Sequence, residues 1–321
     1  MRISQVVAPR TSAVTEVADP RPAADQVLVE VLASGVCTSD LPPWRTGPAG
    51  RDGRPVWLGH EIAGRIVACG AAAGQWQPGD VVTGLGDHGF ASMAVLAAAH
   101  VLPVPAGIEP ALALGEPVAD LAEAMSRTPL ASGSRVAVVG LGFMGLGLVQ
   151  LARERAPGLL IGVDPVPAAR QRALDLGADL VFAPDEIPAS YRGDIVAGQG
   201  SRALDARADV VLEATGVTPG LATAGTLVRP YGTLCVVGYH HAGDARMDMS
   251  LWYKAVTIVN GFCPDRSRLM AAMSDALDLI ARRRFSYAPL ITHRFGLDQV
   301  DEAYTLMDCR TDGFVKAVLV P

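Results

Sequence analysis

Three side chains in the first part of the sequence could together bind a metal ion. Cys37 offers a thiolate, and Gly59-His60-Glu61 adds an imidazole and a carboxylate. These ligand types suit zinc, and a catalytic zinc usually takes three protein ligands and keeps one position open. Each residue alone is weak evidence, because a single histidine or buried cysteine more often only packs in a core. The combination predicts a zinc site.

A glycine-rich turn later in the chain predicts a dinucleotide site. Residues 136–139 have the composition of a buried strand, and Gly140, Gly142 and Gly145 follow at the start of a helical stretch. The first glycine permits the tight turn, the second lets the backbone approach a pyrophosphate, and the third allows close packing of helix and strand. Asp164 ends the next strand about 20 residues on, where an acid bonds ribose hydroxyls and repels a 2′-phosphate. We therefore expect NAD rather than NADP.

These two features predict an alcohol dehydrogenase. A zinc ion polarises an alcohol oxygen, and a nicotinamide accepts the hydride from its carbon.

The bulk properties exclude several other classes. A chain of 321 residues is long enough for two domains, and a composition that is 50% apolar and 19% charged is typical of a folded protein. The net charge of -6, with no basic run, argues against a nucleic-acid partner. No apolar stretch could span a bilayer, and the N-terminus does not resemble a signal peptide. The five cysteines are widely spaced, which is typical of reduced thiols, so we expect a cytoplasmic enzyme without a membrane partner.

The order of expected elements predicts an α/β protein with two domains. Up to about residue 115, short β-type runs such as 26–32 and 63–69 are separated by Gly and Pro, which favours a partly closed β domain. Beyond Pro117, strands alternate with helices, which indicates a doubly wound parallel sheet. The expected strands are 135–139, 159–163, 209–212 and 233–237, and the expected helices are 120–127, 144–155 and 168–176. A helix at 268–284 and a strand at 314–320 end the chain. We assign residues 1–118 and 266–321 to a catalytic domain and 119–265 to an NAD-binding Rossmann domain.

The ordered motifs resemble those of the zinc-dependent alcohol and polyol dehydrogenases of the medium-chain dehydrogenase/reductase superfamily. The resemblance covers nearly the whole chain and is specific as an ordered set. It rests on Gly35-Val-Cys37-Thr-Ser39-Asp40, Gly59-His60-Glu61-Ile-Ala-Gly64, Gly79-Asp80-Val-Val, Gly140-Leu-Gly-Phe-Met-Gly145, Glu213-Ala-Thr-Gly216 and Ile291-Thr-His-Arg-Phe295. It implies a GroES-like β-rich catalytic domain followed by the Rossmann domain.

The resemblance also implies a set of metal ligands. Cys37 and His60 match the first two ligands of the catalytic zinc. Glu61 matches an acid that approaches or exchanges onto the metal. Glu116 matches the third ligand of the polyol branch, which binds directly or through water. Whether Glu61 or Glu116 completes the zinc shell stays open at this point.

Further roles follow from the same resemblance. Asp40 matches an acid that orients the zinc histidine, and Ser39 matches the hydroxyl that accepts the substrate proton. Lys316 falls where relatives place a basic residue against the cofactor pyrophosphate. The complete set of implied cofactor-binding residues is Thr38, Gly140, Gly142, Phe143, Met144, Gly145, Asp164, Arg170, Ala214, Thr215, Gly238 and Lys316.

The sequence departs from the pattern of many relatives at two places. Relatives often carry a lobe with four cysteines for a structural zinc, but no cysteine occurs between Gly79 and Pro103, so we expect one zinc per chain. A histidine that passes the proton to solvent often lies five positions after the ligand cysteine, where this chain has Pro42. The proton route beyond Ser39 therefore stays open.

Several side chains could add to the active site. His88, His240 and His241 are each candidates for the substrate cleft or for the surface, and Trp44 and Phe90 are candidates for lining it. Because Glu116 matches the third ligand of the polyol branch, the resemblance implies a secondary alcohol of polyol, cyclitol or sugar-like character. The physiological direction of the reaction is not indicated.

The resemblance also implies a homodimer or homotetramer. The apolar stretch 256–259 lies where relatives pair strands across a two-fold axis, and an unpaired apolar edge would otherwise favour aggregation.

Two other functions are compatible with the fold. A metal-free NAD(P)H quinone or enoyl reductase would lack the zinc ligands, so Cys37, His60 and Asp164 argue against it. A non-catalytic NAD-binding protein would not need Ser39 and Asp40 beside a ligand set.

Overall fold

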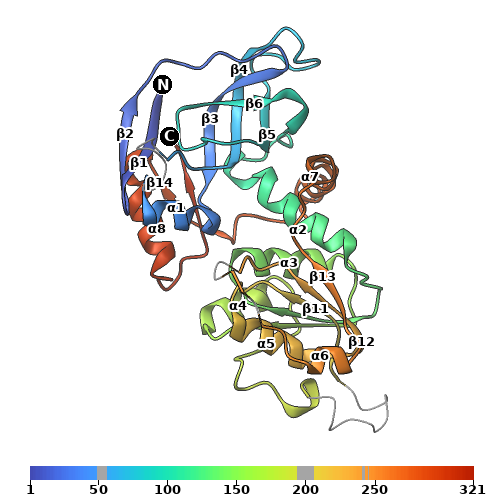
Figure 1. Ribbon diagram of the computed structural model, residues 1–321. Helices are drawn as coiled ribbons and strands as arrows, with labels where there is room; N and C mark the ends of the chain where they lie inside the picture. The colour runs from blue at the N-terminus through green and yellow to red at the C-terminus, as the bar shows by residue number, and fades with distance from the viewer. Residues whose placement is uncertain (49–55, 194–205, 241–242, 245) are drawn as a thin grey trace. The chain divides into compact units, whose positions relative to one another are not determined.

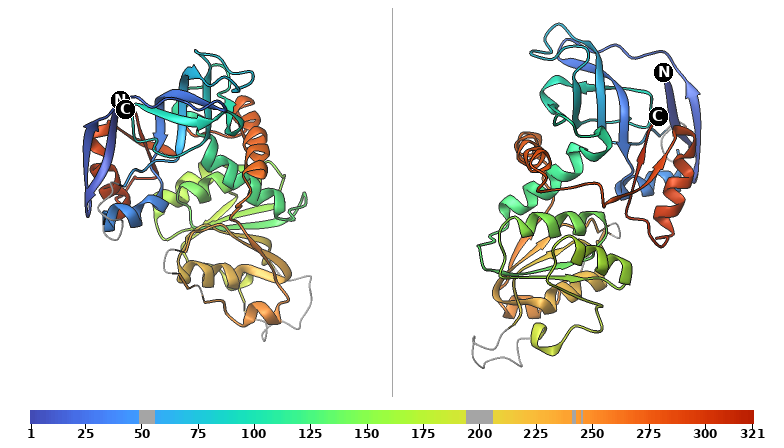
Figure 2. Two further views of the ribbon diagram at one scale, coloured as in Figure 1. Left: turned by 45° about the horizontal axis from the view of Figure 1, so that its top comes forward. Right: turned by 180° about the vertical axis from the view of Figure 1, so that it is seen from behind.

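The computed structural model describes residues 1–48, 56–193, 206–240, 243–244 and 246–321 (Figure 1). Contacts divide the chain into two compact units. Unit 1 consists of Met1–Ala119 and Arg266–Pro321, and unit 2 consists of Asp120–Asp265. Both chain termini therefore belong to unit 1, and they lie close to one another in both views of Figure 2.

Unit 1 is built around a mostly antiparallel sheet. Its strands follow the order β14 (Ile291–Phe295), β15 (Lys316–Leu319), β3 (Gln26–Gly35), β4 (Glu61–Cys69), β5 (Val81–Leu85) and β7 (Val101–Pro103), and β6 (Met93–Ala97) also pairs with β3. Among the described strands of this sheet, β14 and β15 are the one parallel pair. A separate hairpin consists of β1 (Arg2–Ala8) and β2 (Thr11–Glu16). The order β15-β3-β4 brings the end of the chain beside the segments that carry Cys37 and Glu61.

The helices of unit 1 are short except for one near its C-terminal end. They are α1 (Leu41–Thr46), α7 (Arg266–Ala281) and α8 (Val300–Asp308), with 3-10 turns η1 (Thr38–Asp40), η2 (Ala98–His100), η3 (Pro110–Leu112) and η7 (Leu297–Gln299). Helix α2 (Gly115–Arg127) begins in unit 1 and continues into unit 2. One core of unit 1 lies among β3 to β7 and includes Val29, Ile62 and Leu96. A second core packs α1 and α8 together and includes Trp44 and Tyr304.

Unit 2 contains a parallel six-stranded sheet. The strand order is β10 (Leu180–Phe182), β9 (Leu159–Val163), β8 (Arg135–Val139), β11 (Ala208–Glu213), β12 (Val228–Val236) and β13 (Thr257–Asn260). The connecting segments include α3 (Phe143–Arg153), α4 (Pro167–Asp175), η4 (Ala189–Tyr191), α5 (Thr218–Leu227) and α6 (Ser250–Tyr253). The chain order reverses between β8 and β11. Ligands of doubly wound sheets bind beyond the carboxyl ends of the strands at this switch point.

The predicted fold class is confirmed, but several elements extend beyond their predicted ends. The helix expected from residue 120 begins at Gly115, so it includes Pro117. A proline is tolerated in the first turn of a helix, because the N–H that it lacks has no partner within the helix there. The strand expected from residue 233 begins at Val228 and contains Pro230. Among the described residues, no helix is both long enough and apolar enough to cross a membrane.

Candidate active site

Three potential metal ligands meet in unit 1. One ligand atom from each of Cys37, His60 and Glu61 lies within 4.8 Å of the others, and these residues form the one such group found among the described residues. Cys37 is the residue that precedes η1, and His60 and Glu61 lead into β4. The structure therefore brings together the first three ligand candidates that the sequence indicated.

Two glycines make room for this group. Gly59 has a φ of +89°, and a Cβ there would lie 2.5 Å from the ring of Phe90, so a larger residue would not fit before His60. Gly35 lies directly opposite Glu61 in the β3–β4 register. A Cβ at Gly35 would lie 1.7 Å from Oε2 of Glu61, so the space beside β3 is occupied by this carboxylate.

Both ring nitrogens of His60 have a polar contact. Its Nδ1 lies 3.4 Å from Oδ1 of Asp40, and its Nε2 lies 3.4 Å from Oγ of Ser39. The Ser39 hydroxyl also donates to Sγ of Cys37 at 3.3 Å. Burial alone would lower the pKa of His60, but hydrogen bonds to Asp40 and Cys37 and the charge of Glu116 raise the pKa to about 12. With Nδ1 directed at Asp40, Nε2 is the nitrogen available on the side of Ser39 and Cys37.

The carboxylate of Glu61 is buried, and one of its two oxygens has a hydrogen-bond partner among the described residues. Its side chain is 1% exposed, and Oε1 accepts a hydrogen bond from Nζ of Lys316 at 2.5 Å. Its Oε2 has no hydrogen-bond partner among the described residues. Buried polar atoms nearly always have a partner, so an unpaired carboxylate oxygen beside a thiol and an imidazole fits a bound cation. The donor set of sulfur, nitrogen and oxygen suits zinc.

Lys316 is a cation inside unit 1. Its side chain is 4% exposed. Burial lowers the pKa of Lys316, but the charges of Glu61, Cys37 and Glu116 outweigh burial, so the pKa is raised above its ordinary value. The resemblance placed Lys316 against a cofactor pyrophosphate, which stays a prediction, whereas the ion pair with Glu61 was not anticipated.

Glu116 lies near the group without joining it. It is half-buried in the first turn of α2, and it is not part of the group whose atoms lie within 4.8 Å of one another. Its charge nevertheless raises the pKa of His60, so its carboxylate acts on the site electrostatically. In this geometry Glu61 is the nearer third ligand. Thr38, in the same turn as Ser39, is exposed.

The glycine-rich turn of unit 2 connects β8 to α3. Gly140 has a φ of +90°, and a Cβ at Gly145 would lie 1.7 Å from the carbonyl oxygen of Gly140. Packing within the protein therefore requires both glycines. A Cβ at Gly142 would meet no atom of the described residues within 4 Å, so packing among these residues does not require this glycine. The open space fits a ligand that approaches the backbone there, as a pyrophosphate does. Phe143 and Met144 open the helix that follows.

Asp164 lies beside the same turn. Its Oδ2 accepts a hydrogen bond from the backbone N–H of Leu141 at 2.8 Å, and its Oδ1 accepts one from Val166 at 2.8 Å. The guanidinium of Arg170 donates to the carbonyl oxygens of Asp164 and Pro165 at 2.7 and 2.9 Å. An acid and an arginine therefore both lie beside the Gly140–Gly145 turn.

The ends of β11 and β12 meet around Glu213. Glu213 is fully buried, its Oε1 accepts hydrogen bonds from the backbone N–H groups of Thr215 and Gly216, and its Oε2 lies 3.3 Å from Nε2 of His240. The predicted cofactor residues Ala214, Thr215 and Gly238 lie in these two turns. His240 therefore contacts the buried Glu213 where β11 and β12 end. His241 lies outside the described residues.

The predicted roles of two aromatic residues are wrong. Trp44 and Phe90 are each 1% exposed and belong to the core around α1 and α8, so they do not line a cleft. His88 has a φ of +62° and is exposed, and its ring lies edge-on to the partly exposed Trp57 at 4.7 Å. His88 therefore lies on a surface turn.

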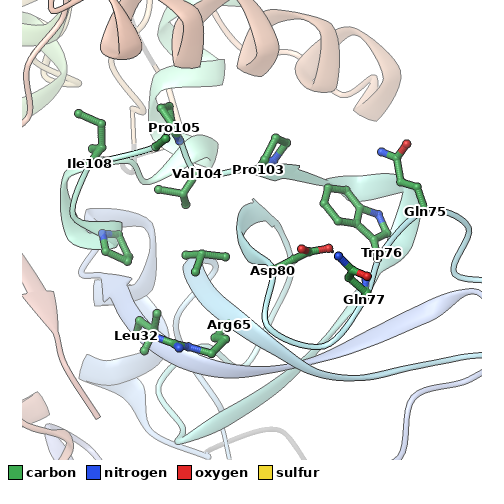
Figure 3. A pocket seen from close by; sticks show the side chains of 14 residues that line it. Leu32, Arg65, Gln75, Trp76, Gln77, Asp80, Pro103, Val104, Pro105 and Ile108 are labelled. Atoms are coloured by element: carbon green, nitrogen blue, oxygen red, sulfur yellow. The ribbon is translucent and has the colours of Figure 1, made fainter.

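Unit 1 also contains a cleft of about 820 Å³ (Figure 3). It is lined by residues such as Leu32, Arg65, Trp76, Asp80 and Ile108. None of Cys37, His60 and Glu61 contributes to it. The cleft lacks a set of metal-ligating side chains, so the candidate active site is the group of Cys37, His60 and Glu61.

Two contributors to the site were missed in the sequence. Tyr304 donates a hydrogen bond to Asp40 at 3.0 Å. The two residues are 264 positions apart, so no local motif predicts this contact. Glu213 was noted only as part of a family motif. A charged residue at the end of an apolar strand, before a Thr-Gly turn, was the available signal.

Comparison with known proteins identifies the family. Residues 23–106 match the model of the alcohol dehydrogenase GroES-like domain, and residues 144–282 match that of the zinc-binding dehydrogenases. The chain is 26% identical to a sorbitol dehydrogenase from Halalkalibacterium halodurans, over 96% of this chain and 95% of that protein. It is 26% identical to an NADP-dependent isopropanol dehydrogenase from Clostridium beijerinckii, over 91% of this chain and 92% of that protein. The crystal structure of galactitol-1-phosphate dehydrogenase from Escherichia coli has the same fold, with a TM-score of 0.83, 22% identity and full coverage of both chains.

The fold and the matches define an oxidoreductase of the alcohol dehydrogenase type. More narrowly, the chain belongs to the zinc-binding medium-chain dehydrogenases, as its motifs predicted.

Proposed function

We propose that this protein interconverts a polar secondary alcohol and its ketone with NAD, at a zinc ion held by Cys37, His60 and Glu61. The main support is the composition of the ligand group. A thiol, an imidazole and an unpartnered buried carboxylate oxygen converge, and the hydroxyl of Ser39 lies within hydrogen-bond distance of the first two. The exposure of Ser39 gives a substrate hydroxyl a route to this hydroxyl.

Different residues of the chain have different roles in the proposed reaction. A zinc ion bound here would lower the pKa of an alcohol hydroxyl, and bound NAD would supply the hydride acceptor. The Ser39 hydroxyl can take the proton of the substrate, because it donates and accepts hydrogen bonds at once. Asp40 holds the His60 ring, and Lys316 holds one oxygen of Glu61. The Gly140–Gly145 turn and Asp164 bind the dinucleotide.

The proposed substrate class is a polyol, cyclitol or sugar-like alcohol. The charge of Glu116 close to His60 supports it, because a carboxylate there can accept a hydrogen bond from a second substrate hydroxyl. Sites built to bond hydroxyls discriminate against analogues without them, since their own polar groups then go unpaired. The names of the sorbitol and galactitol-1-phosphate relatives agree with this class. The isopropanol dehydrogenase represents the competing class of simple alcohols.

The preference for NAD rests on Asp164. A carboxylate at the end of β9 accepts hydrogen bonds from ribose hydroxyls and repels a 2′-phosphate. Arg170 already donates to two backbone carbonyls, which ties its guanidinium to the chain.

Metal analysis and kinetics test the proposal together. We expect about one zinc per chain, and kcat/KM values that are higher for NAD than for NADP and higher for a vicinal diol than for the matching mono-alcohol. Cys37→Ser should lose both zinc and activity, whereas Cys309→Ser, at an exposed cysteine, should keep both. Full activity after complete chelation would support a metal-free reductase instead. Binding of NAD without turnover on any alcohol would support a non-catalytic protein.

We further propose a homodimer or homotetramer that works in the cytoplasm. Within the described part of the chain, β13 is an edge strand with one neighbour, and Ile258 on it is 44% exposed. Pairing with the same strand of a second copy would cover this edge. Sedimentation should show an oligomer that Ile258→Lys dissociates, while Val17→Lys, at a similarly exposed valine outside the sheet, leaves it intact. The five free cysteines support a reducing compartment.

A further inference from the structure

A tyrosine from the C-terminal helix is bonded to the acid that holds the proposed zinc histidine. Tyr304, on α8, is fully buried, and its hydroxyl donates to Oδ2 of Asp40 at 3.0 Å. The two residues are 264 positions apart. This contact therefore exists only because α8 packs against the turn that contains Cys37 and Asp40.

Asp40 has a donor for each of its oxygens. Oδ1 faces Nδ1 of His60 at 3.4 Å, and Oδ2 accepts from both Tyr304 and the backbone N–H of Gly59, the latter at 3.3 Å. The tyrosine contact is the shortest of the three. It fixes the rotation of the carboxylate, because the oxygen that it holds determines where the other oxygen points. Without the Tyr304 hydroxyl, the carboxylate could turn away from His60.

The ring of Tyr304 is held independently of its hydroxyl. It stacks on Trp44 with ring centres 5.4 Å apart, and it contacts Phe90 at 6.0 Å. Trp44 is itself fixed, because its Nε1 donates to Oδ1 of Asp301 at 2.8 Å. A phenylalanine would fill the same space, so packing does not explain the hydroxyl. Burial and the charge of Asp40 raise the pKa of Tyr304 well above its ordinary value, so the hydroxyl keeps the proton that it donates.

We propose that Tyr304 is a positioning residue for the metal centre, which sets the orientation of His60 through Asp40 and thereby increases the affinity for zinc. The inference rests on the proposed zinc site. Groups that orient metal-bound histidines typically change metal affinity 10- to 100-fold when they are removed. Tyr304 acts one contact further from the metal, so we expect an effect of about 10-fold, near the lower end of that range.

The zinc dissociation constant of the full-length apoprotein, measured by competition with a chromogenic chelator, tests the proposal. Tyr304→Phe should raise this constant about 10-fold. Trp44→Phe is the matched control, since it disturbs the same aromatic core but leaves the hydroxyl of Tyr304 on Asp40. It should lower thermal stability at least as much as Tyr304→Phe and change zinc affinity less than about 3-fold, a smaller effect than that of groups orienting a metal histidine.

A double-variant comparison separates positioning from general loosening. In an Asp40→Ala background, Tyr304→Phe should have no further effect on zinc affinity, because the link is already broken. The same loss in both backgrounds would overturn the proposal, as would wild-type affinity in Tyr304→Phe, or an equal loss in Trp44→Phe. If the wild-type protein itself binds no zinc, the proposed metal centre fails and the inference fails with it.

Discussion

The buried ion pair of Glu61 and Lys316 makes a strong prediction about stability. Replacing Lys316 with methionine keeps most of the side-chain volume but removes the cation. The carboxylate of Glu61 would then lose the donor to Oε1, while Oε2 already has no hydrogen-bond partner among the described residues. Removing one partner of a buried ion pair typically destabilises a protein by about 3–5 kcal/mol, because the other charge stays buried without compensation. Both side chains are nearly inaccessible, so we expect Lys316→Met to fall within this range.

Urea unfolding of the apoprotein measures this loss. The metal is removed first, because bound zinc would add its own stabilisation. Tryptophan fluorescence reports mainly on unit 1, since Trp44, Trp57 and Trp76 lie there and only Trp252 lies in unit 2. A loss of 3 kcal/mol should lower the urea midpoint by about 1 M or more.

The double variant Glu61→Gln/Lys316→Met provides the control. It removes both charges, so it should regain about 2 kcal/mol or more relative to Lys316→Met, consistent with replacement of a buried pair being far milder than its disruption. Because the folded-state pKa of Lys316 is raised, the stability that the pair contributes is fully present below the ordinary lysine value of 10.5 and declines as the pH rises through the raised value. A loss of stability below about 1 kcal/mol in Lys316→Met would refute the reasoning. So would a loss in the double variant that equals the sum of the losses in Lys316→Met and Glu61→Gln measured separately.

Three further predictions concern the metal site, the cofactor and the ion pair of Asp308 with Arg45. Gly35→Ala should displace the Glu61 carboxylate and weaken zinc binding about 10-fold or more by chelator competition, and unchanged affinity would show that Oε2 is not a ligand. Asp164→Ala should reduce the ratio of kcat/KM for NAD over NADP about 10-fold, chiefly through poorer use of NAD, and an unchanged ratio would contradict the assignment. The pKa of Asp308 is lowered by Arg45, so Asp308→Asn should destabilise the protein at pH 7 by up to about 1 kcal/mol. That difference should disappear as the pH falls below 3.8 and through the lowered pKa, and a difference that persists in acid would exclude the charge as its cause.

The sequence predicted the parts of the site that follow local rules. Cys37, His60 and Glu61 could be grouped as candidate ligands because their residue types alone indicate metal binding. The Gly140–Gly145 turn was predictable for a similar reason, since a tight turn and close helix packing each demand glycine at a fixed spacing. The strand order of unit 2 agrees with the predicted doubly wound sheet, because alternation of strands and helices restricts the possible topologies.

What the sequence did not predict depends on contacts between distant segments. The burial of Trp44 and Phe90 results from α8 packing over α1, and the hydrogen bond from Tyr304 to Asp40 arises from the same packing. Neither has a local pattern, because an aromatic residue near a ligand turn is compatible with both a cleft and a core. The early start of α2 has a local reason, since a proline such as Pro117 often marks a helix boundary but is also accepted in a first helical turn.

The order of strands in unit 1 also bears on the third zinc ligand. Lys316 on β15, Gly35 on β3 and Glu61 on β4 lie on three neighbouring strands. Lys316 occupies Oε1 of Glu61, and Gly35 leaves space beside β3 for Oε2. Glu61 can therefore offer zinc a single oxygen while its other oxygen keeps the ammonium. A carboxylate held in this way stays within reach of the metal and remains neutralised if a water or a substrate oxygen takes its place. Glu116 lies outside the close group, and its charge still raises the pKa of His60.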